Sequence, residues 1–356
     1  MSSDSPAPTR QARIIDALAD AASEWEDEDH PVRRAAVEKT LEAPNRFTEK
    51  SVEYALRHEL SRLSPEAVEA WLGETWAEEP ATVAVRAAGE TPFDALRDAV
   101  AVWGTGHRLV LSVSDASPAL LPAFVESIQN RRPDLPVSVV DRDALLERAD
   151  AVIAQPDGEE RQALEDACEA HGIPPARRHI RRPVFSVGVI DGQESEEERE
   201  DLAADMLLHE GKGRARLALL WAPRNLSPDP YLEAMAQFRG AVPAHDDTPG
   251  ALQMQQAFLE AQDVSHAYAA GLQFLVSRAE PEVQPAGHVR WTEYDDRAEV
   301  DAWLQEHADD LYAIVAREGL HDTLPPVAPI LRPGEAHGAP VDDREGEAVV
   351  RFLAGL

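Results

Sequence analysis

Residues 201–223 read DLAADMLLHEGKGRARLALLWAP, and the rest of the chain can be organised around this stretch. Its first half carries apolar residues at helical spacing, which predicts a helix that ends near Glu210. The apolar run from Leu217 to Trp221 predicts a buried strand. The stretch is therefore expected to be a helix, a short turn and a strand, which is the repeating unit of α/β proteins.

Two glycines separate the expected helix from the expected strand. Gly211 and Gly213 predict a tight turn, because glycine adopts backbone conformations that other residues rarely adopt and lets the backbone approach a neighbour closely. In an enzyme, such a turn can present one reactive side chain. The side chain at that place is Arg214.

Strands and helices alternate on both sides of this junction. The alternation predicts parallel sheets with right-handed crossovers, and hence an α/β fold. Strands are expected at 82–87, 109–113, 137–140, 151–154, 184–190, 272–276 and 289–293, and helices at 11–26, 48–60, from Ser64-Pro65 onward, at 196–210, 249–268 and 297–318. Thr91-Pro92 and Ser117-Pro118 have the composition of helix starts. No Gly-x-Gly-x-x-Gly motif follows the first strand of this pattern, so the dinucleotide fingerprint is absent.

The composition excludes several classes of function. There are 66 acidic and 34 basic residues, which give a net charge of −32 and argue against a nucleic-acid partner. The acidic excess and the preference for arginine over lysine predict a solvated surface of a halophilic kind. Cys168 is the single cysteine, and no metal-ligand spacing of histidines occurs, so neither a disulfide nor a metal site is expected. No apolar run approaches a membrane span and no signal peptide is found, so we expect a cytoplasmic protein.

Several segments resemble the acyl-CoA reductases of the LuxC type, a branch of the aldehyde dehydrogenase superfamily. The resemblance begins with Gly211-Lys-Gly-Arg214 and the strand ending in Trp-Ala-Pro, and it continues in Ala88-Gly-Glu-Thr-Pro92, Thr105-Gly-His107 and Asp150-Ala-Val-Ile-Ala154. It implies an aldehyde dehydrogenase-like fold. We therefore expect an N-terminal helical segment at 1–80, a Rossmann-type cofactor-binding domain at 81–183, a catalytic-type α/β domain at 184–330 and a C-terminal tail at 331–356.

The resemblance also implies where chemistry would take place, and the sequence departs from the family at those positions. Arg214 stands where the family has its nucleophilic cysteine, in the turn of Gly211 and Gly213. Glu90 stands where the family has an asparagine that stabilises an oxyanion, and His107 lies in the segment that follows.

The cofactor positions differ in a similar way. Ser112 replaces the family's cofactor-binding lysine, and Ser114 lies in the same segment. The family's phosphate turn reads Gln155-Pro156-Asp157 here, and Gly158, which follows, supplies a glycine only if the alignment is shifted by one residue. Pro156 lacks an N–H donor, and Asp157 places an anion where a phosphate would bind.

Two functional hypotheses remain open. The resemblance implies an NADPH-dependent acyl-CoA reductase that makes a fatty aldehyde from an acyl-CoA or another acyl thioester, with weak or lost catalysis. Arg214 cannot form an acyl-enzyme, because a guanidinium has no nucleophilic electron pair. The alternative is a non-catalytic homologue that forms a homodimer or a hetero-oligomer with an active reductase or an acyl-transfer protein. NADPH is the cofactor that the resemblance implies, and the departures at Ser112, Pro156 and Asp157 predict that it binds weakly or is not retained.

Two further features each have a structural and a functional interpretation. Cys168 lies in a helical stretch and is expected to be a buried structural residue, although a substitute nucleophile is the alternative. The arginines at 177, 178, 181 and 182 are expected to form surface ion pairs, and a site for the phosphates of CoA or NADPH is the alternative.

Overall fold

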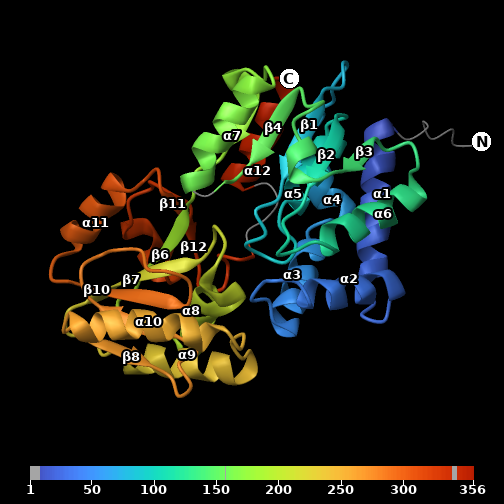
Figure 1. The fold of residues 1–356 in the computed structure, drawn as a ribbon. Helices are drawn as coiled ribbons and strands as arrows, with labels where there is room; N and C mark the ends of the chain where they lie inside the picture. The colour runs from blue at the N-terminus through green and yellow to red at the C-terminus, as the bar shows by residue number, and fades with distance from the viewer. Residues whose placement is uncertain (1–8, 157, 339–342) are drawn as a thin grey trace, which may run out of the picture. The chain divides into compact units, whose positions relative to one another are not determined.

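The β-branched runs form strands of two separate, mainly parallel sheets, as the sequence pattern predicts (Figure 1). The computed structural model describes residues 9–156, 158–338 and 343–356. These residues fall into two units. Unit 1 comprises the described parts of Met1–Asn45, Val52–Arg182 and Pro340–Leu356, and unit 2 comprises Arg46–Ser51 and the described part of Pro183–Ala339.

Unit 1 contains a five-stranded sheet in the order β3-β2-β1-β4-β5, in which every pairing is parallel. Its strands are β1 (Thr82–Arg86), β2 (Arg108–Ser112), β3 (Val137–Val139), β4 (Ala151–Ala154) and β5 (Arg178–Ile180). The first four confirm the predicted strands. The sequence pattern did not predict β5, which has only three residues and two charged or polar side chains.

Several helices of unit 1 pack on this sheet or on one another. The helices are α1 (Arg10–Trp25), α2 (Pro31–Leu41), α4 (Pro65–Leu72), α5 (Leu96–Gly104), α6 (Leu120–Arg131), α7 (Gly158–Ala170) and α12 (Arg344–Ala354), and α3 (Glu49–Ser61) begins in the segment assigned to unit 2. α7 contributes Leu164 and Cys168 to an apolar cluster with β4. α5 packs on β1 and β2 and is in turn contacted by α1 and α12.

The expected helix starts were partly right. Ser64 accepts a hydrogen bond from the Ala67 amide and Pro65 is the first residue of α4, as predicted. The prediction for Thr91-Pro92 was wrong, because α5 begins only at Leu96. Ser117 does not cap α6 either: its hydroxyl donates to the carbonyl of Pro92, so it ties two loops together instead.

Unit 2 contains a seven-stranded sheet in the order β12-β11-β6-β7-β10-β9-β8. All neighbours are parallel except β8 and β9. The elements are β6 (Phe185–Val189), α8 (Glu196–Leu207), β7 (Leu217–Pro223), α9 (Asp229–Ala241), α10 (Thr248–Ala261), β8 (His266–Tyr268), β9 (Leu275–Arg278), β10 (His288–Tyr294), α11 (Arg297–Glu306), β11 (Leu311–Val315) and β12 (Ile330–Leu331).

Two predicted helices extended too far. The expected helix 249–268 ends as α10 at Ala261, and its last residues form the edge strand β8. The segment 297–318 is helical only as α11, and Leu311–Val315 is a strand between β6 and β12. Its side chains are mostly buried on both faces, so the strand lacks the alternation that marks a half-exposed strand. Leu311 and Val315 also lie four residues apart, which imitates the spacing of a helix face.

Helices cover both faces of the sheet in unit 2. α8 and α9 pack on one face, through residues such as Met206 and Met235. α11 packs on the opposite face through Val300 and Leu304, and α10 packs against Leu275 of β9. The three-layer arrangement confirms the expected α/β class. Within the ranges that the structure describes, no helix combines the length and the apolar composition that crossing a membrane requires.

Candidate functional site

The turn predicted ahead of β7 has the geometry that its glycines suggest. Gly211 has φ 65° and Gly213 has φ 85°, both in the left-handed region. The Lys212 amide donates to the carbonyl of His209 at 3.1 Å, and the Arg216 amide donates to that of Gly213 at 3.3 Å. Arg214 is half-buried in the second of these turns. The structure therefore brings Gly211, Gly213 and Arg214 together in one short segment.

Gly211 also allows a close backbone approach. A Cβ atom at this position would lie 3.0 Å from the carbonyl oxygen of Met206 and 3.1 Å from the amide nitrogen of Gly287. Both are backbone atoms, so no side-chain rotation could relieve the contact. The segment 287–288, where β10 begins, therefore lies directly beside the turn.

The two residues before the turn have unusual backbone conformations. His209 (φ 52°) and Glu210 (φ 60°) both lie in the left-handed region, which costs non-glycine residues about 1–3 kcal/mol each. Glu210 is buried, pairs with Arg239 at 3.2 Å and accepts a hydrogen bond from the Thr248 hydroxyl. These contacts hold the strained segment in place. They also engage the Glu210 carboxylate, so it is a poor candidate for a general base.

A second buried acid supports the end of α8. Burial raises the pKa of Asp205 to about 8, although hydrogen bonds from the backbone at Gly334 and Ala336 oppose the shift. The Gly334 amide donates to Asp205 at 2.8 Å. His337 approaches the Asp205 carbonyl at 3.2 Å and its ring lies 5.6 Å from that of His209. Segment 334–337 thus secures the strained turn from a distant part of the sequence.

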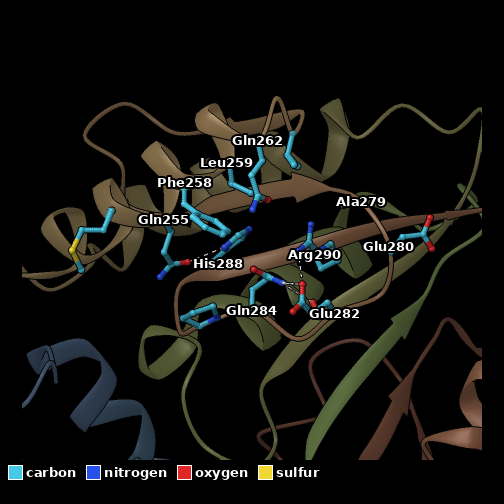
Figure 2. A pocket seen from close by; sticks show the side chains of 13 residues that line it. Gln255, Phe258, Leu259, Gln262, Ala279, Glu280, Glu282, Gln284, His288 and Arg290 are labelled. Carbon is cyan, nitrogen blue, oxygen red and sulfur yellow. Dashed lines mark hydrogen bonds and ion pairs between the residues drawn. The ribbon is translucent and has the colours of Figure 1, made fainter.

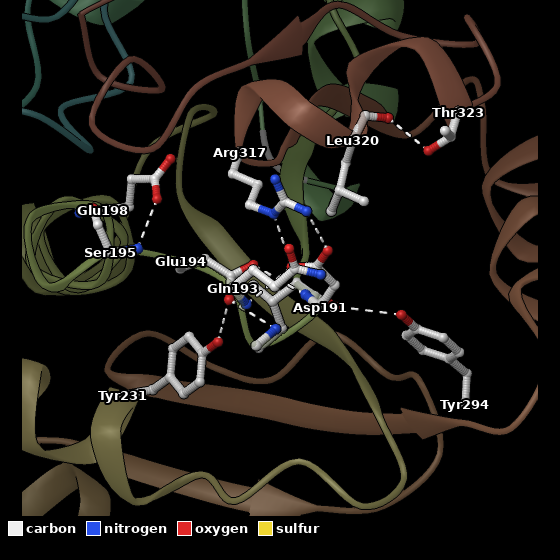
Figure 3. A network of polar contacts seen from close by, with 12 residues as sticks. Asp191, Gln193, Glu194, Ser195, Glu198, Tyr231, Tyr294, Arg317, Leu320 and Thr323 are labelled. Carbon is white, nitrogen blue, oxygen red and sulfur yellow. Dashed lines mark hydrogen bonds and ion pairs between the residues drawn. The ribbon is translucent and has the colours of Figure 1, made fainter.

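The start of α8 is held by a polar network (Figure 3). Ser195 and Glu198 form a capping box, in which each side chain accepts a hydrogen bond from the other's backbone amide. Glu194 accepts hydrogen bonds from two backbone amides and from the Tyr231 hydroxyl. Asp191 pairs with Arg317 through contacts of 2.9 and 2.6 Å. The helix that leads to the Arg214 turn is therefore fixed at both ends.

In unit 1, the loop after β1 carries the Gly89-Glu90 pair. Gly89 has φ 77°, and Glu90 is exposed. The Asp94 carboxylate accepts hydrogen bonds from the amides of Ala88 at 2.7 Å and Gly89 at 2.8 Å. An acid of the chain itself thus occupies amides that could otherwise bind an external anion.

The serines that replace the family's lysine segment have different surroundings. Ser112 ends β2 and is buried, with 3% of its surface exposed. Ser114 is half-buried, and its hydroxyl accepts a hydrogen bond from the Ala116 amide at 3.2 Å. Neither residue supplies a positive charge at the edge of the sheet where the parallel strands β1 and β2 end.

The cations beside this edge have acidic partners. Arg86, the last residue of β1, pairs with Glu160 in the first turns of α7, and Arg142 contacts the same carboxylate at 2.8 Å. Pro156 is buried and Gly158 is exposed at the start of α7, whereas Asp157 lies outside the described residues.

His107 has a structural environment. It is 3% exposed, its Nδ1 accepts from the Ala81 amide at 3.1 Å, and its Nε2 lies 3.1 Å from the carbonyl of Leu353. Burial lowers its pKa, although the bond to Leu353 opposes this shift. The neutral ring with a proton on Nε2 satisfies both contacts and connects the start of β2 to α12.

Cys168 and the arginine cluster also have structural environments. Cys168 is fully buried beside β4, and burial raises the pKa of its thiol, which disfavours the reactive thiolate. Arg178 donates to the Ile173 carbonyl at 2.8 and 2.6 Å, and Arg181 pairs with the buried Asp98. At least these two arginines bind their own chain. No group of three or more metal-ligating side chains converges in the parts of the chain that the structure describes.

Sequence reasoning missed one pocket, which lies in unit 2 between α10 and the segment joining β9 to β10 (Figure 2). Its volume is about 420 Å³. His288 and Arg290 of β10 line it together with Phe258 of α10. The signal in the sequence was a histidine and an arginine alternating with apolar residues in a strand, but that pattern is also typical of an exposed polar face.

Comparisons with known proteins identify the fold. No protein-family profile matches the sequence, and no curated protein matches it. An NAD-dependent benzaldehyde dehydrogenase from Corynebacterium glutamicum has a similar structure, with a TM-score of 0.66 at 11% identity over 94% of this chain and 84% of that one. A variant of the Thermus thermophilus 1-pyrroline-5-carboxylate dehydrogenase gives 0.66 at 13% identity, over 99% and 80% of the two chains. The chain therefore has the fold of the aldehyde dehydrogenase superfamily.

Proposed function

We propose that this chain is a divergent homologue of the LuxC-type acyl-CoA reductases that binds an acyl thioester and has lost the reduction step. The observation that carries the proposal is Arg214 in the turn of Gly211 and Gly213. Thioester reduction needs a thiolate that forms an acyl-enzyme, and a guanidinium has no electron pair for this attack. On this proposal, residues 184–330 correspond to the catalytic-type domain.

The described residues of unit 1 do not fit the phosphates of NADPH. The amides of Ala88 and Gly89 are bonded to Asp94, and Glu160 engages both Arg86 and Arg142. Ser112 offers no cation in place of the family's lysine. Residues 81–183 therefore correspond, on this proposal, to a cofactor-type domain that binds NADPH weakly or not at all and supports no hydride transfer.

Arg214 gives the proposed binding function a physical basis. A half-buried guanidinium forms charge-assisted hydrogen bonds with carboxylates and phosphates, and acyl-CoA carries phosphates on its nucleotide. A chain that binds without converting could act beside an active reductase or an acyl-transfer protein in a homo- or hetero-oligomer.

Intact-mass spectrometry after incubation with an acyl-CoA tests the nucleophile assignment. The wild-type chain is expected to show no acyl adduct, whereas Arg214→Cys should be acylated slowly. Arg214→Cys combined with Glu90→Asn and Ser112→Lys should also form some aldehyde with NADPH, because these changes restore the amide and the cation. All variants should carry Cys168→Ala, so that any adduct can be assigned to the introduced thiol.

Arg216→Cys is the matched control, because Arg216 closes the same turn two residues later. An adduct on the wild type, or equal acylation of the two single cysteine variants, would show that position 214 is not the nucleophile position. A direct titration tests the cofactor part of the proposal. One lost cation–phosphate contact costs about tenfold or more in affinity, so low-micromolar NADPH binding to the wild type would contradict it.

A further inference from the structure

The pocket beside β10 combines a polar floor with an apolar wall (Figure 2). His288 and Arg290 lie two residues apart on β10, so their side chains project to the same face of the strand. That face looks toward α10, which contributes Gln255, Phe258 and Leu259. The pocket volume of about 420 Å³ lies in the range of small-molecule sites, roughly 300–1,000 Å³.

Arg290 is a buried cation whose hydrogen-bonding capacity is incompletely used. The residue is only 5% exposed, and its Nε is buried without a hydrogen-bond partner among the described residues. Its Nη2 lies 3.5 Å from Glu282, whose side chain is 78% exposed. The buried Arg239 also has nitrogens without a hydrogen-bond partner among the described residues, but its counter-charge is a Glu210 side chain that lies 3.2 Å away and is itself 5% exposed. A buried guanidinium is costly to desolvate, so Arg290 favours an additional anionic partner.

His288 is not a second cation that could bind an anion in the pocket. Its Nδ1 lies 2.8 Å from the side-chain oxygen of Gln255, and its Nε2 lies 2.7 Å from the hydroxyl of Ser277. Burial, assisted by the nearby Arg290, lowers its pKa to about 4, so the ring is neutral at neutral pH. Arg290 is therefore the cation among the side chains that line the pocket.

The wall of the pocket exposes large apolar side chains. Phe258 is 63% exposed and Met254 is 76% exposed, although the chain has a net charge of −32. Adjacent exposed apolar side chains of this size are typical of binding surfaces. Leu259 and Val264 extend the apolar lining from the same region.

We propose that this pocket binds an amphipathic monocarboxylate, such as a medium-chain fatty acid anion, with its carboxylate on Arg290 and its alkyl chain along Phe258 and Met254. A single guanidinium matches one carboxylate, for which it can provide two parallel N–H donors. Glu280 and Glu282 at the same pocket disfavour ligands with several negative charges, such as nucleotides. This site goes beyond the proposed thioester chemistry and does not depend on Arg214.

Calorimetric titration of the full chain with octanoate tests the proposal. Saturable one-to-one binding is expected, with a Kd on the order of 1 mM or tighter. Octan-1-ol should bind about tenfold more weakly, because it lacks the charge that Arg290 recognises. Butyrate should also bind more weakly than octanoate, because its shorter chain leaves the wall uncovered.

Three variants locate the site. Arg290→Gln should weaken octanoate binding about tenfold. Glu282→Gln should strengthen it about threefold, because a competing carboxylate is removed, and this exposed position leaves folding intact. Arg278→Gln is the matched control on the neighbouring strand, since Arg278 pairs with Glu293 and does not line the pocket, and it should bind like the wild type.

Several results would overturn the proposal. These are equal binding of octanol and octanoate, full competition by inorganic phosphate, or unchanged affinity in Glu282→Gln. The last test remains decisive if Arg290→Gln does not fold. A second copy of the chain is the other occupant to test by sedimentation. A dimer that Phe258→Ser dissociates, together with no octanoate binding, would assign this surface to self-association instead.

Discussion

The edge of the sheet in unit 1 and the pocket in unit 2 use their charged groups in opposite ways. At the edge, Glu160 engages Arg86 and Arg142, and Asp94 engages two backbone amides. In the pocket, the Nε of Arg290 has no hydrogen-bond partner among the described residues, and its contact to an exposed acid is long. In a chain with a net charge of −32, acids are available to saturate most cations. The position of the nearest acid therefore determines where an external anion can bind.

Two buried acids near the turn before β7 also differ in their partners. Glu210 is buried with a cation, Arg239, whereas the Asp205 carboxyl is buried against the backbone amides of Gly334 and Ala336. We therefore expect the two acids to affect stability differently when the pH or the residue is changed, because a buried carboxylate needs a counter-charge and otherwise takes up a proton.

The largest effect should come from the pH dependence of Asp205. Its folded-state pKa of about 8 exceeds the ordinary value of 3.8, so the folded chain binds this proton more tightly than the unfolded chain does. The stabilisation is fully present below about pH 4 and is lost as the pH rises to about 8. Between pH 5 and 8, the free energy of unfolding should fall by roughly 4 kcal/mol from this group alone.

Denaturant unfolding at pH 5, 6.5 and 8 measures this change, and Asp205→Asn serves as the reference that cannot titrate. The amide side chain can still accept the hydrogen bond from the Gly334 amide. Parallel pH profiles for the wild type and the variant would contradict a neutral Asp205 in the folded chain.

A somewhat smaller loss is expected when the acid of the buried pair is neutralised. Glu210→Gln leaves the Arg239 guanidinium buried without a counter-charge, which should lower the free energy of unfolding by about 3 kcal/mol. Glu282→Gln removes the acid beside Arg290 but should cost less than about 0.5 kcal/mol, because that contact is long and exposed. Urea unfolding of both variants checks the contrast, and equal losses would refute it.

The edge of unit 1 should gain affinity for anions when its internal acid is removed. Asp94→Ala frees the amides of Ala88 and Gly89, and should cost about 1–2 kcal/mol of stability because their hydrogen bonds are lost. Binding of inorganic pyrophosphate should become about tenfold tighter. Asp115→Ala, which removes an exposed acid, is the control for net charge. Equal effects of the two variants would mean that the amides are not the anion site.

The smallest effect concerns the start of α8. Ser195→Ala removes a capping-box acceptor and should lower the free energy of unfolding by about 1 kcal/mol. Ser61→Ala, at the exposed end of α3, is the comparison and should have a negligible effect. Thermal and urea unfolding would show whether the cap stabilises the helix that leads to the Arg214 turn.

Local patterns were sufficient to predict most of the fold. Runs such as 82–87 and 151–154 form neighbouring parallel strands, and the glycines at 211 and 213 form the expected turn, because these features depend on side-chain branching and on allowed backbone angles. Leu311–Val315 was misassigned to a helix because a strand buried on both faces has no alternating pattern.

The sequence by itself determined the acidic character, the alternation of strands and helices, and the placement of Arg214 in a glycine turn. Only the tertiary structure decided which charged groups are saturated. Glu160 reaches Arg86 from 74 residues away, and Arg239 reaches Glu210 from 29 residues away. α10 covers the strand face that carries Arg290, which the alternation in 288–292 alone would have placed in solvent. Burial and counter-charge are properties of packed neighbours, and they depend on elements that are distant in the chain.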